Sequence, residues 1–191
     1  MCHKLLQDAR LYALLLKFDE DLAAEVRAAG CACGGRLDAG HYPRKPRGGP
    51  HGLGAKYDLR LSFCCAVDGC RARRMPASVR FLGPKVFFGA VVVLATAMQQ
   101  GPTRQRASRL SDLLGVSLRT LARWRRWWAA AFRASRFWRS LRSRFMPAVD
   151  EHALPRALLG RFEGDARTRL VALLRLLRPI STTPGLAASG S

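Results

Sequence analysis

Residues 108–128 constrain the fold of this chain most, because they read as a helix, a glycine turn and a second helix rich in arginine and tryptophan. Gly115 suits a tight turn between helices, and Ser117 is a good N-cap for a helix that starts at Leu118. The apolar residues before the turn share one helical face: Leu110, Leu113 and Leu114. This order of elements predicts a helix-turn-helix.

The second helix has two contrasting faces. Its apolar face, which we expect to pack inward, repeats at helical spacing: Leu121, Trp124 and Trp128. The opposite face is basic, and Arg119, Thr120 and Arg123 are expected to face the major groove of double-stranded DNA. The other candidate contacts are the N-cap residue and four arginines expected to neutralise phosphates: Ser117, Arg104, Arg106, Arg125 and Arg126.

The charge of the whole chain also indicates a polyanionic partner. Lys and Arg number 33 against 13 Asp and Glu, which gives a formal net charge of +20. Between Arg71 and Arg144 the basic residues number 17, and Asp112 is the one acid. Because an arginine-rich composition also follows from a GC-rich genome, charge alone proves little. Its concentration beside a helix-turn-helix pattern predicts nucleic-acid binding.

Five of the six cysteines fall in a glycine- and proline-rich stretch, in two groups. In a cytosolic chain this pattern favours a metal ion over disulfides, and a unit this poor in apolar residues would gain folding energy from the ion. We expect one zinc ion, with four thiolate ligands: Cys31, Cys33, Cys65 and Cys70. Cys64 and His41 are possible substitutes, because the C-x-C and C-x4-C spacings differ from the C-x2-C pairs of standard zinc ribbons.

Two other interpretations of the cysteines stay open. They could be buried small hydrophobic residues, or the remains of a decayed zinc knuckle. The same four thiolates could also hold an iron–sulfur cluster, although no C-x2-C run supports that choice.

Periodicity predicts the remaining elements. The first 30 residues are expected to be helical, with Asp19–Asp21 at the start of a second helix that Gly30 ends. Alternation over 57–63 predicts a strand that buries its apolar residues. Residues 71–80 are a basic extended segment that either follows a phosphate backbone or is a solvated surface. Further helices are expected over 86–99, 104–114, 118–130, 132–145 and 166–177.

A chain of 191 residues with 49% hydrophobic content can bury one moderate core or two small ones. We expect an α+β, mostly α fold, with a small cysteine-rich, zinc-ribbon-like unit followed by a homeodomain-like helix-turn-helix bundle. The expected divisions are N-terminal helices, the cysteine-rich unit, the bundle, C-terminal helices and a disordered tail: 1–30, 31–80, 84–145, 146–178 and 179–191.

No stretch is convincing as a secretory signal, and the longest apolar run is short of the roughly 20 residues that a membrane-spanning helix needs. We therefore expect a cytoplasmic protein without a membrane partner. No phosphate-cradling glycine loop or G-x-S-x-G motif is present, and no small-molecule substrate is evident.

Several segments together resemble the N-terminal portion of bacterial insertion-element transposase-related proteins, over roughly residues 31–130. They are CxCGG, YPRKPRG, YDLRLSFCC, GCRxR, SVRFLG and LGVSLRTLARWRRWW. The resemblance implies recognition of the ends of an insertion element, or regulation of one.

The resemblance does not extend to a catalytic domain. DDE-type transposases place three carboxylates on an RNase H-like sheet, and the acids after the helix-turn-helix lie in helical sequence: Asp150, Glu151, Glu163 and Asp165. We therefore expect a DNA-binding protein that is not an enzyme, with strand transfer left to a separate transposase subunit. A zinc-ribbon protein that binds RNA or ribosomes, and a nonfunctional transposon remnant, are the alternatives.

Overall fold

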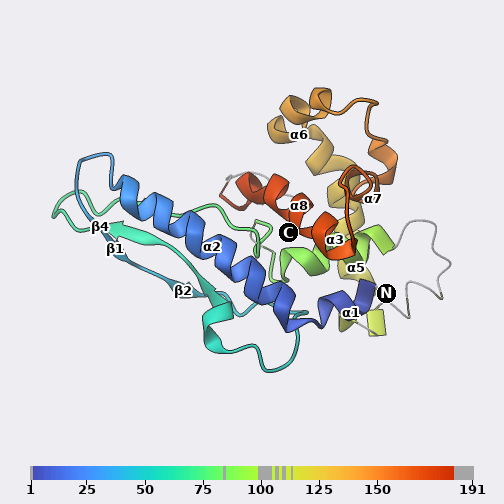
Figure 1. The fold of residues 1–191 in the computed structure, drawn as a ribbon, viewed down its shortest axis with the longest axis horizontal. Helices are drawn as coiled ribbons and strands as arrows, with labels where there is room; N and C mark the ends of the chain where they lie inside the picture. Colours follow the sequence, from blue (N-terminus) through green and yellow to red (C-terminus); the bar gives the residue numbers. More distant parts are fainter. Residues whose placement is uncertain are drawn as a thin grey trace.

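The computed structural model describes residues 2–83, 85–98 and 114–182, together with residues 105, 108, 111 and 112. The fold is α+β and mostly helical, as the sequence predicts. Figure 1 shows a helical bundle toward one end of the long axis and the small strands with their loops at the other. The long helix α2 (Ala9–Ala29) runs from the bundle toward the strands.

The N-terminal region is helical, but its break lies earlier than the sequence analysis expects. Helix α1 (Cys2–Leu6) is followed by α2, and the side chain of Asp8 accepts a hydrogen bond from the Arg10 N–H as the N-cap of α2. Asp19 does not begin a helix; it lies within α2 and is buried. The expectation for Asp19 was wrong because its carboxylate is used in a tertiary contact instead of a cap.

Two small sheets form the β part of the fold. Strands β1 (Leu37–Ala39), β4 (Phe63–Cys65) and β5 (Arg73–Arg74) pair antiparallel in the order β1-β4-β5. A second antiparallel pair joins β2 (Tyr42–Pro43) and β3 (Leu59–Arg60), and β3 follows the 3₁₀ turn η1 (Ala55–Asp58). These strands bring the two groups of cysteines to the same end of the molecule.

The alternating stretch 57–63 differs from the predicted strand. It is split into η1, β3 and β4, and the fully buried positions include the polar residues Arg60 and Ser62. Arg60 donates to the carbonyl oxygen of Pro76 at 2.6 Å, and the hydroxyl of Ser62 donates to the carbonyl oxygen of Gly40. Alternation failed here because these two polar side chains find backbone partners inside the fold.

A buried ion pair joins α2 to the segment after β5. The Arg80 Nε lies 2.8 Å from an Asp19 carboxylate oxygen, and both side chains are almost completely excluded from solvent. Asp19 also accepts from the Ser78 hydroxyl and the Val79 N–H. Of the basic residues in the segment 71–80, Arg80 is therefore buried, whereas Arg71, Arg73 and Arg74 are exposed.

The main core surrounds helix α3 (Gly89–Met98). Every residue of α3 from Gly89 to Thr96 is buried, since α1, α5 (Leu118–Trp127), α7 (Arg156–Leu159) and α8 (Ala166–Leu177) all contact it. The apolar run 86–99 thus forms a buried helix as predicted, starting at Gly89. Helix α8 has the predicted bounds and buries its four periodic leucines: Leu170, Leu173, Leu174 and Leu177.

The chain after α5 is less regular than the predicted helices. A π-helical turn, η2 (Trp128–Phe132), leads to α6 (Arg136–Leu141) and the 3₁₀ turn η3 (Arg142–Arg144). The turn η4 (Glu151–Ala153) presents a carboxylate to three donors, on Arg133, Trp138 and Arg142. The turn η5 (Arg178–Ser181) buries Ile180, so the predicted disordered tail does not begin at 179.

The predicted helix over 104–114 lies mostly outside the described residues, and so do Arg104 and Arg106. The turn after it is described: Gly115 has a φ of +59°, and the flanking Leu114 and Val116 are buried. A positive φ is the backbone conformation that favours glycine. The glycine turn is confirmed, whereas the homeodomain-like arrangement of three helices stays a prediction.

Candidate metal centre and basic helix

Four cysteines meet at the end of the molecule that carries the strands. Cys31 follows Gly30, the C-cap of α2, and Cys33 lies in the next turn. Cys65 ends β4, and Cys70 lies in the turn after β4. Their four Sγ atoms all lie within 4.8 Å of one another. Because β1 pairs with β4 in a register that sets Leu37 opposite Cys65, the sheet holds the two groups of cysteines together.

The sulfur spacing suits a tetrahedral metal site. The Sγ atoms of Cys31 and Cys70 are 3.8 Å apart, and those of Cys33 and Cys65 are 3.4 Å apart. With metal–sulfur bonds of about 2.3 Å, as for zinc, the edge of a regular tetrahedron is about 3.8 Å. The four thiols could therefore hold a metal ion with little movement.

Two tight turns present these sulfur atoms. In the first, the Gly34 N–H donates to the Cys31 carbonyl at 2.9 Å, and Gly34 has a φ of +82°. In the second, the Val67 N–H donates to the Cys65 Sγ at 3.5 Å. Backbone N–H groups that point at sulfur stabilise the thiolate that a metal needs.

Gly35 lies against the sulfur cluster and leaves no room for a side chain. A Cβ atom at this position would lie 2.5 Å from the Val67 Cγ2 and 2.8 Å from the Cys65 Sγ. Both distances are far below van der Waals contact, so the two turns can approach each other only with glycine at this position.

The thiols of Cys31 and Cys65 differ in pKa. A hydrogen bond from the Cys33 backbone N–H, helped by neighbouring thiols, lowers the pKa of Cys31 to about 6. The Val67 N–H acts to lower the pKa of Cys65, but burial and the neighbouring thiols outweigh it and raise that pKa to about 12. Cys31 thus favours the thiolate form, whereas a divalent ion would have to displace the proton of Cys65.

Cys64 and His41, the two substitute ligands, do not join the cluster. Cys64 is next to Cys65 on β4, and successive strand residues point to opposite faces of a sheet. His41 accepts a hydrogen bond on Nδ1 from the Ser62 N–H at 3.1 Å, and its ring packs edge-on against Phe63. Among the described residues, the cluster consists of the four expected ligands.

Helix α5 begins at the predicted cap. The Ser117 side chain accepts from the Thr120 N–H at 3.3 Å, and the two hydroxyl oxygens are 3.0 Å apart. Thr120 is half-buried, so its hydroxyl belongs to the cap more than to the exposed face. The predicted inward face is confirmed and also includes Trp127: the buried residues are Leu121, Trp124, Trp127 and Trp128.

Four arginines occupy the exposed face of α5: Arg119, Arg123, Arg125 and Arg126. Within the described residues, no carboxylate lies at ion-pair distance from any of them. Arg133 and Arg142, in contrast, share the carboxylate of Glu151. The face of α5 is therefore a patch of positive charge without internal compensation.

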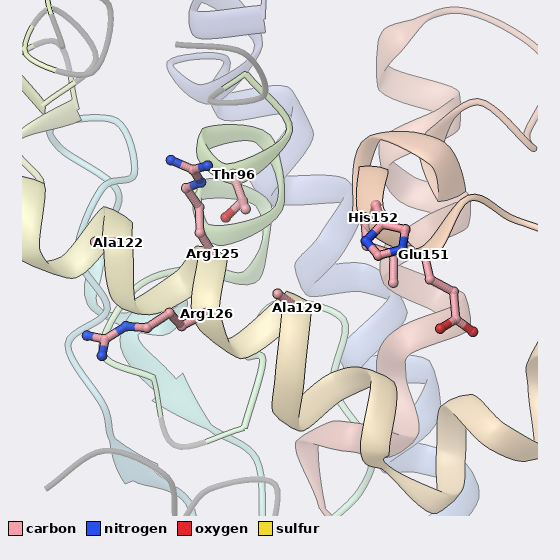
Figure 2. Close-up of a pocket in the computed structure, with 8 residues that line it drawn as sticks. Thr96, Ala122, Arg125, Arg126, Ala129, Glu151 and His152 are labelled. Atoms are coloured by element: carbon pink, nitrogen blue, oxygen red, sulfur yellow. The ribbon is translucent and has the colours of Figure 1, made fainter. Parts of the chain in front are cut away.

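A cavity of about 380 Å³ lies beside α5, between that helix, the end of α3 and η4. Figure 2 shows Arg125 and Arg126 extending to different sides of α5, with Glu151 and His152 on the opposite wall. The Glu151 charge is already met by Arg133 and Arg142, so it does not neutralise the α5 arginines.

Sequence reasoning missed one cation, Lys85. Its Nζ lies 4.3 Å from the ring centroid of Trp127, which brings it next to the basic face of α5. Residue 85 stands ahead of the apolar run that forms α3, and no local pattern indicates a contact with a residue so far along the chain.

Comparisons with protein-family models, with curated proteins and with solved structures gave no match. In the described part of the chain, no helix combines the length and the apolar character needed to cross a membrane.

Proposed function

We propose that this chain is a zinc-containing protein that binds double-stranded DNA through α5 and leaves strand transfer to another protein. The observation that carries the proposal is the set of four exposed α5 arginines without a carboxylate partner among the described residues. Such a face suits a polyanion, because each arginine that meets a phosphate releases condensed counterions.

The build of α5 supports a role as a recognition helix. Tryptophan and leucine anchor one side in the main core, and Phe87 packs edge-on against Trp124 with ring centroids 5.0 Å apart. A helix held this firmly can present its other side to a groove with little loss of side-chain or backbone freedom.

The residues at the centre of the exposed face differ from those expected from sequence, which were Arg119, Thr120 and Arg123. Arg119, Ala122 and Arg126 follow the i, i+3, i+7 spacing of a single face, and all three are exposed. We propose that Arg119 and Arg126 read bases, with Ala122 leaving room for a thymine methyl group. Arg123 and Arg125 lie to either side and suit phosphates, and Thr120 serves the cap.

For the cysteine cluster we propose zinc. Four soft thiolates in tetrahedral spacing match the ligand preference of this ion, which would stabilise the cysteine-rich unit. Figure 1 shows that this unit lies toward the opposite end of the long axis from α5. Its role is therefore structural with respect to the α5 contact. By the resemblance to transposase-related proteins, the DNA would be an insertion-element end and the catalytic subunit a separate chain.

Salt-dependent binding to a random-sequence duplex library, followed by site selection, tests DNA recognition. We expect Arg126→Ala to cost about 1–3 kcal/mol on the selected sequence. Arg27→Ala removes the same charge from the exposed face of α2 and should change binding little. No enrichment over random sequence, or equal losses for Arg126→Ala and Arg27→Ala, would refute base recognition by α5.

Metal analysis of the purified chain tests zinc. About one zinc ion per chain is expected, lost in a Cys65→Ala/Cys70→Ala double variant and retained in Cys64→Ala, whose thiol lies outside the cluster. A folded protein without metal would end the zinc proposal, and iron with inorganic sulfide would replace it by a cluster.

A further inference from the structure

Lys85 is held in place by contacts on both its side chain and its backbone. Its ammonium group lies over the Trp127 ring, and Arg44 donates to the carbonyl oxygens of Lys85 and Gly83 at 3.1 and 2.9 Å. The next carbonyl, that of Val86, accepts from the Arg47 N–H at 2.8 Å. A lysine fixed at both ends has lost much of the freedom that normally weakens its contacts.

The second cation near the Lys85 ammonium group is Arg123. It precedes Trp127 by four residues on α5, so the two side chains leave the helix one turn apart, where its exposed face borders its buried face. The charge of Arg123 acts on the Lys85 ammonium group, which itself lies over the Trp127 ring. Neither cation has an ion-pair partner among the residues that the structure describes.

The surroundings of Lys85 disfavour its charged form. Burial, with the nearby charge of Arg123, lowers the pKa of Lys85 to about 8. Two neighbouring positive charges raise each other's energy, and the cost grows where burial removes water. A bound anion would offset this repulsion and stabilise the charged form of Lys85.

We infer that Lys85 and Arg123 together grip one phosphate of the nucleic-acid backbone, at the side of α5, and so set the depth and angle at which α5 enters the groove. The inference rests on the proposed function and names a contact within it. Phosphate is favoured over a carboxylate of a protein partner because the adjoining face carries further unpaired arginines, which match a repeating polyanion.

The test compares Lys85→Met, Arg123→Met and the double variant with the wild type in salt titrations on a random-sequence duplex. Each single variant should reduce the salt slope by about one and the affinity about five- to tenfold. Because both residues hold the same phosphate, the double variant should lose less than the product of the two single losses.

Lys56→Met is the matched control. Lys56 also lies over an aromatic ring, with its Nζ 5.3 Å from the Tyr57 centroid, but it belongs to η1. It should bind as the wild type does. If Lys85→Met also keeps wild-type affinity and slope, or if the two single losses simply multiply, the shared phosphate is refuted while DNA binding stands.

A second measurement separates the inference from the proposed function. In ¹³C-lysine spectra of the wild type, inorganic pyrophosphate should shift the Lys85 Cε signal more than that of Lys56, and the selective shift should vanish in Arg123→Met. If the protein does not bind duplex DNA but pyrophosphate still shifts the Lys85 signal selectively, the DNA proposal is wrong and phosphate binding by Lys85 and Arg123 is supported. Equal or absent shifts overturn the grip itself.

Discussion

At the residue scale, buried polar side chains hold the two halves of the fold together. All three guanidinium nitrogens of Arg80 donate hydrogen bonds: Nε to Asp19, Nη1 to the Tyr57 carbonyl and Nη2 to the Leu59 carbonyl. The three acceptors come from α2, η1 and β3. A single buried arginine therefore ties the N-terminal helix to the cysteine-rich unit.

Removing the carboxylate of this pair should be costly. Asp19→Ala leaves Arg80 as a buried charge without its counterion, and we expect a loss of about 3–5 kcal/mol in the free energy of unfolding. Urea denaturation followed by circular dichroism measures it. Glu20→Ala, at the exposed neighbouring position, should change stability by less than about 0.5 kcal/mol. Similar effects of both substitutions would mean that the pair is not important for stability.

Lys85 should lower stability at neutral pH. Its folded pKa, about 8, lies below the ordinary 10.5 because of burial and then Arg123, so above pH 8 the unfolded chain binds more protons. The penalty is complete below pH 8 and disappears as the pH rises to 10.5. Lys85→Met should therefore be more stable at pH 7 by on the order of 1–2 kcal/mol.

Thermal melts at several pH values check this expectation, and the advantage of Lys85→Met should shrink between pH 8 and 10.5. The charged groups near Lys85 are the guanidinium groups of Arg123 and Arg44, which stay protonated over this range. A variant less stable than the wild type at pH 7 would show that Lys85 is a structural residue.

At the element scale, short turns decide whether the cysteines can act together. The two cysteine-bearing turns of the candidate metal centre lie outside long helices and strands. The neighbouring strands β1, β4 and β5 have only two or three residues each. Such short strands contribute little stability by themselves. The close approach of the turns at Gly35 therefore depends on local sterics and on the bound ion.

Gly35→Ala tests this dependence. The added methyl group would overlap Val67 and Cys65, push the turns apart and weaken metal binding. We expect at least a tenfold lower zinc affinity in competition with a chromophoric chelator. The control is Gly54→Ala, a position with a negative φ where a Cβ meets open space. Unchanged affinity in Gly35→Ala would show that the turns are not tightly apposed.

At the scale of the whole molecule, the described residues form two separate apolar clusters of very different size. The larger one surrounds α3, whereas the smaller contains five buried residues: Ala23, Cys31, Leu37, Phe63 and Cys65. Two of these five are cysteines of the candidate metal centre. A cluster of this size cannot offset the ordering of its loops, so we expect the cysteine-rich unit to need its ion.

Metal removal should then unfold one part of the molecule and leave the other intact. The four tryptophans all lie in the larger cluster: Trp124, Trp127, Trp128 and Trp138. With a strong chelator, tryptophan emission should stay native while amide exchange at Leu37 and Phe63 rises sharply. A simultaneous red shift in emission would mean that the two clusters unfold together.

Much of the helical part follows from sequence because its causes are local. The spacing of the leucines in 166–177 defines α8, the Ser117 cap and the tryptophan spacing define α5, and length with apolar character identifies α3. The four metal-ligand candidates were also predictable, since glycine-bearing turns and paired cysteines are local signals. These features depend on residues only a few positions apart.

The tertiary structure alone decided the features that join distant parts of the chain. Asp19 is read locally as a cap, but it lies buried against Arg80; Arg60 is read as exposed, but it lies inside the fold. Likewise, only packing brings Lys85 to Trp127 and Arg123. The physical reason is the same in each case: a buried charge is tolerated only where remote groups compensate it, and no local period encodes those groups.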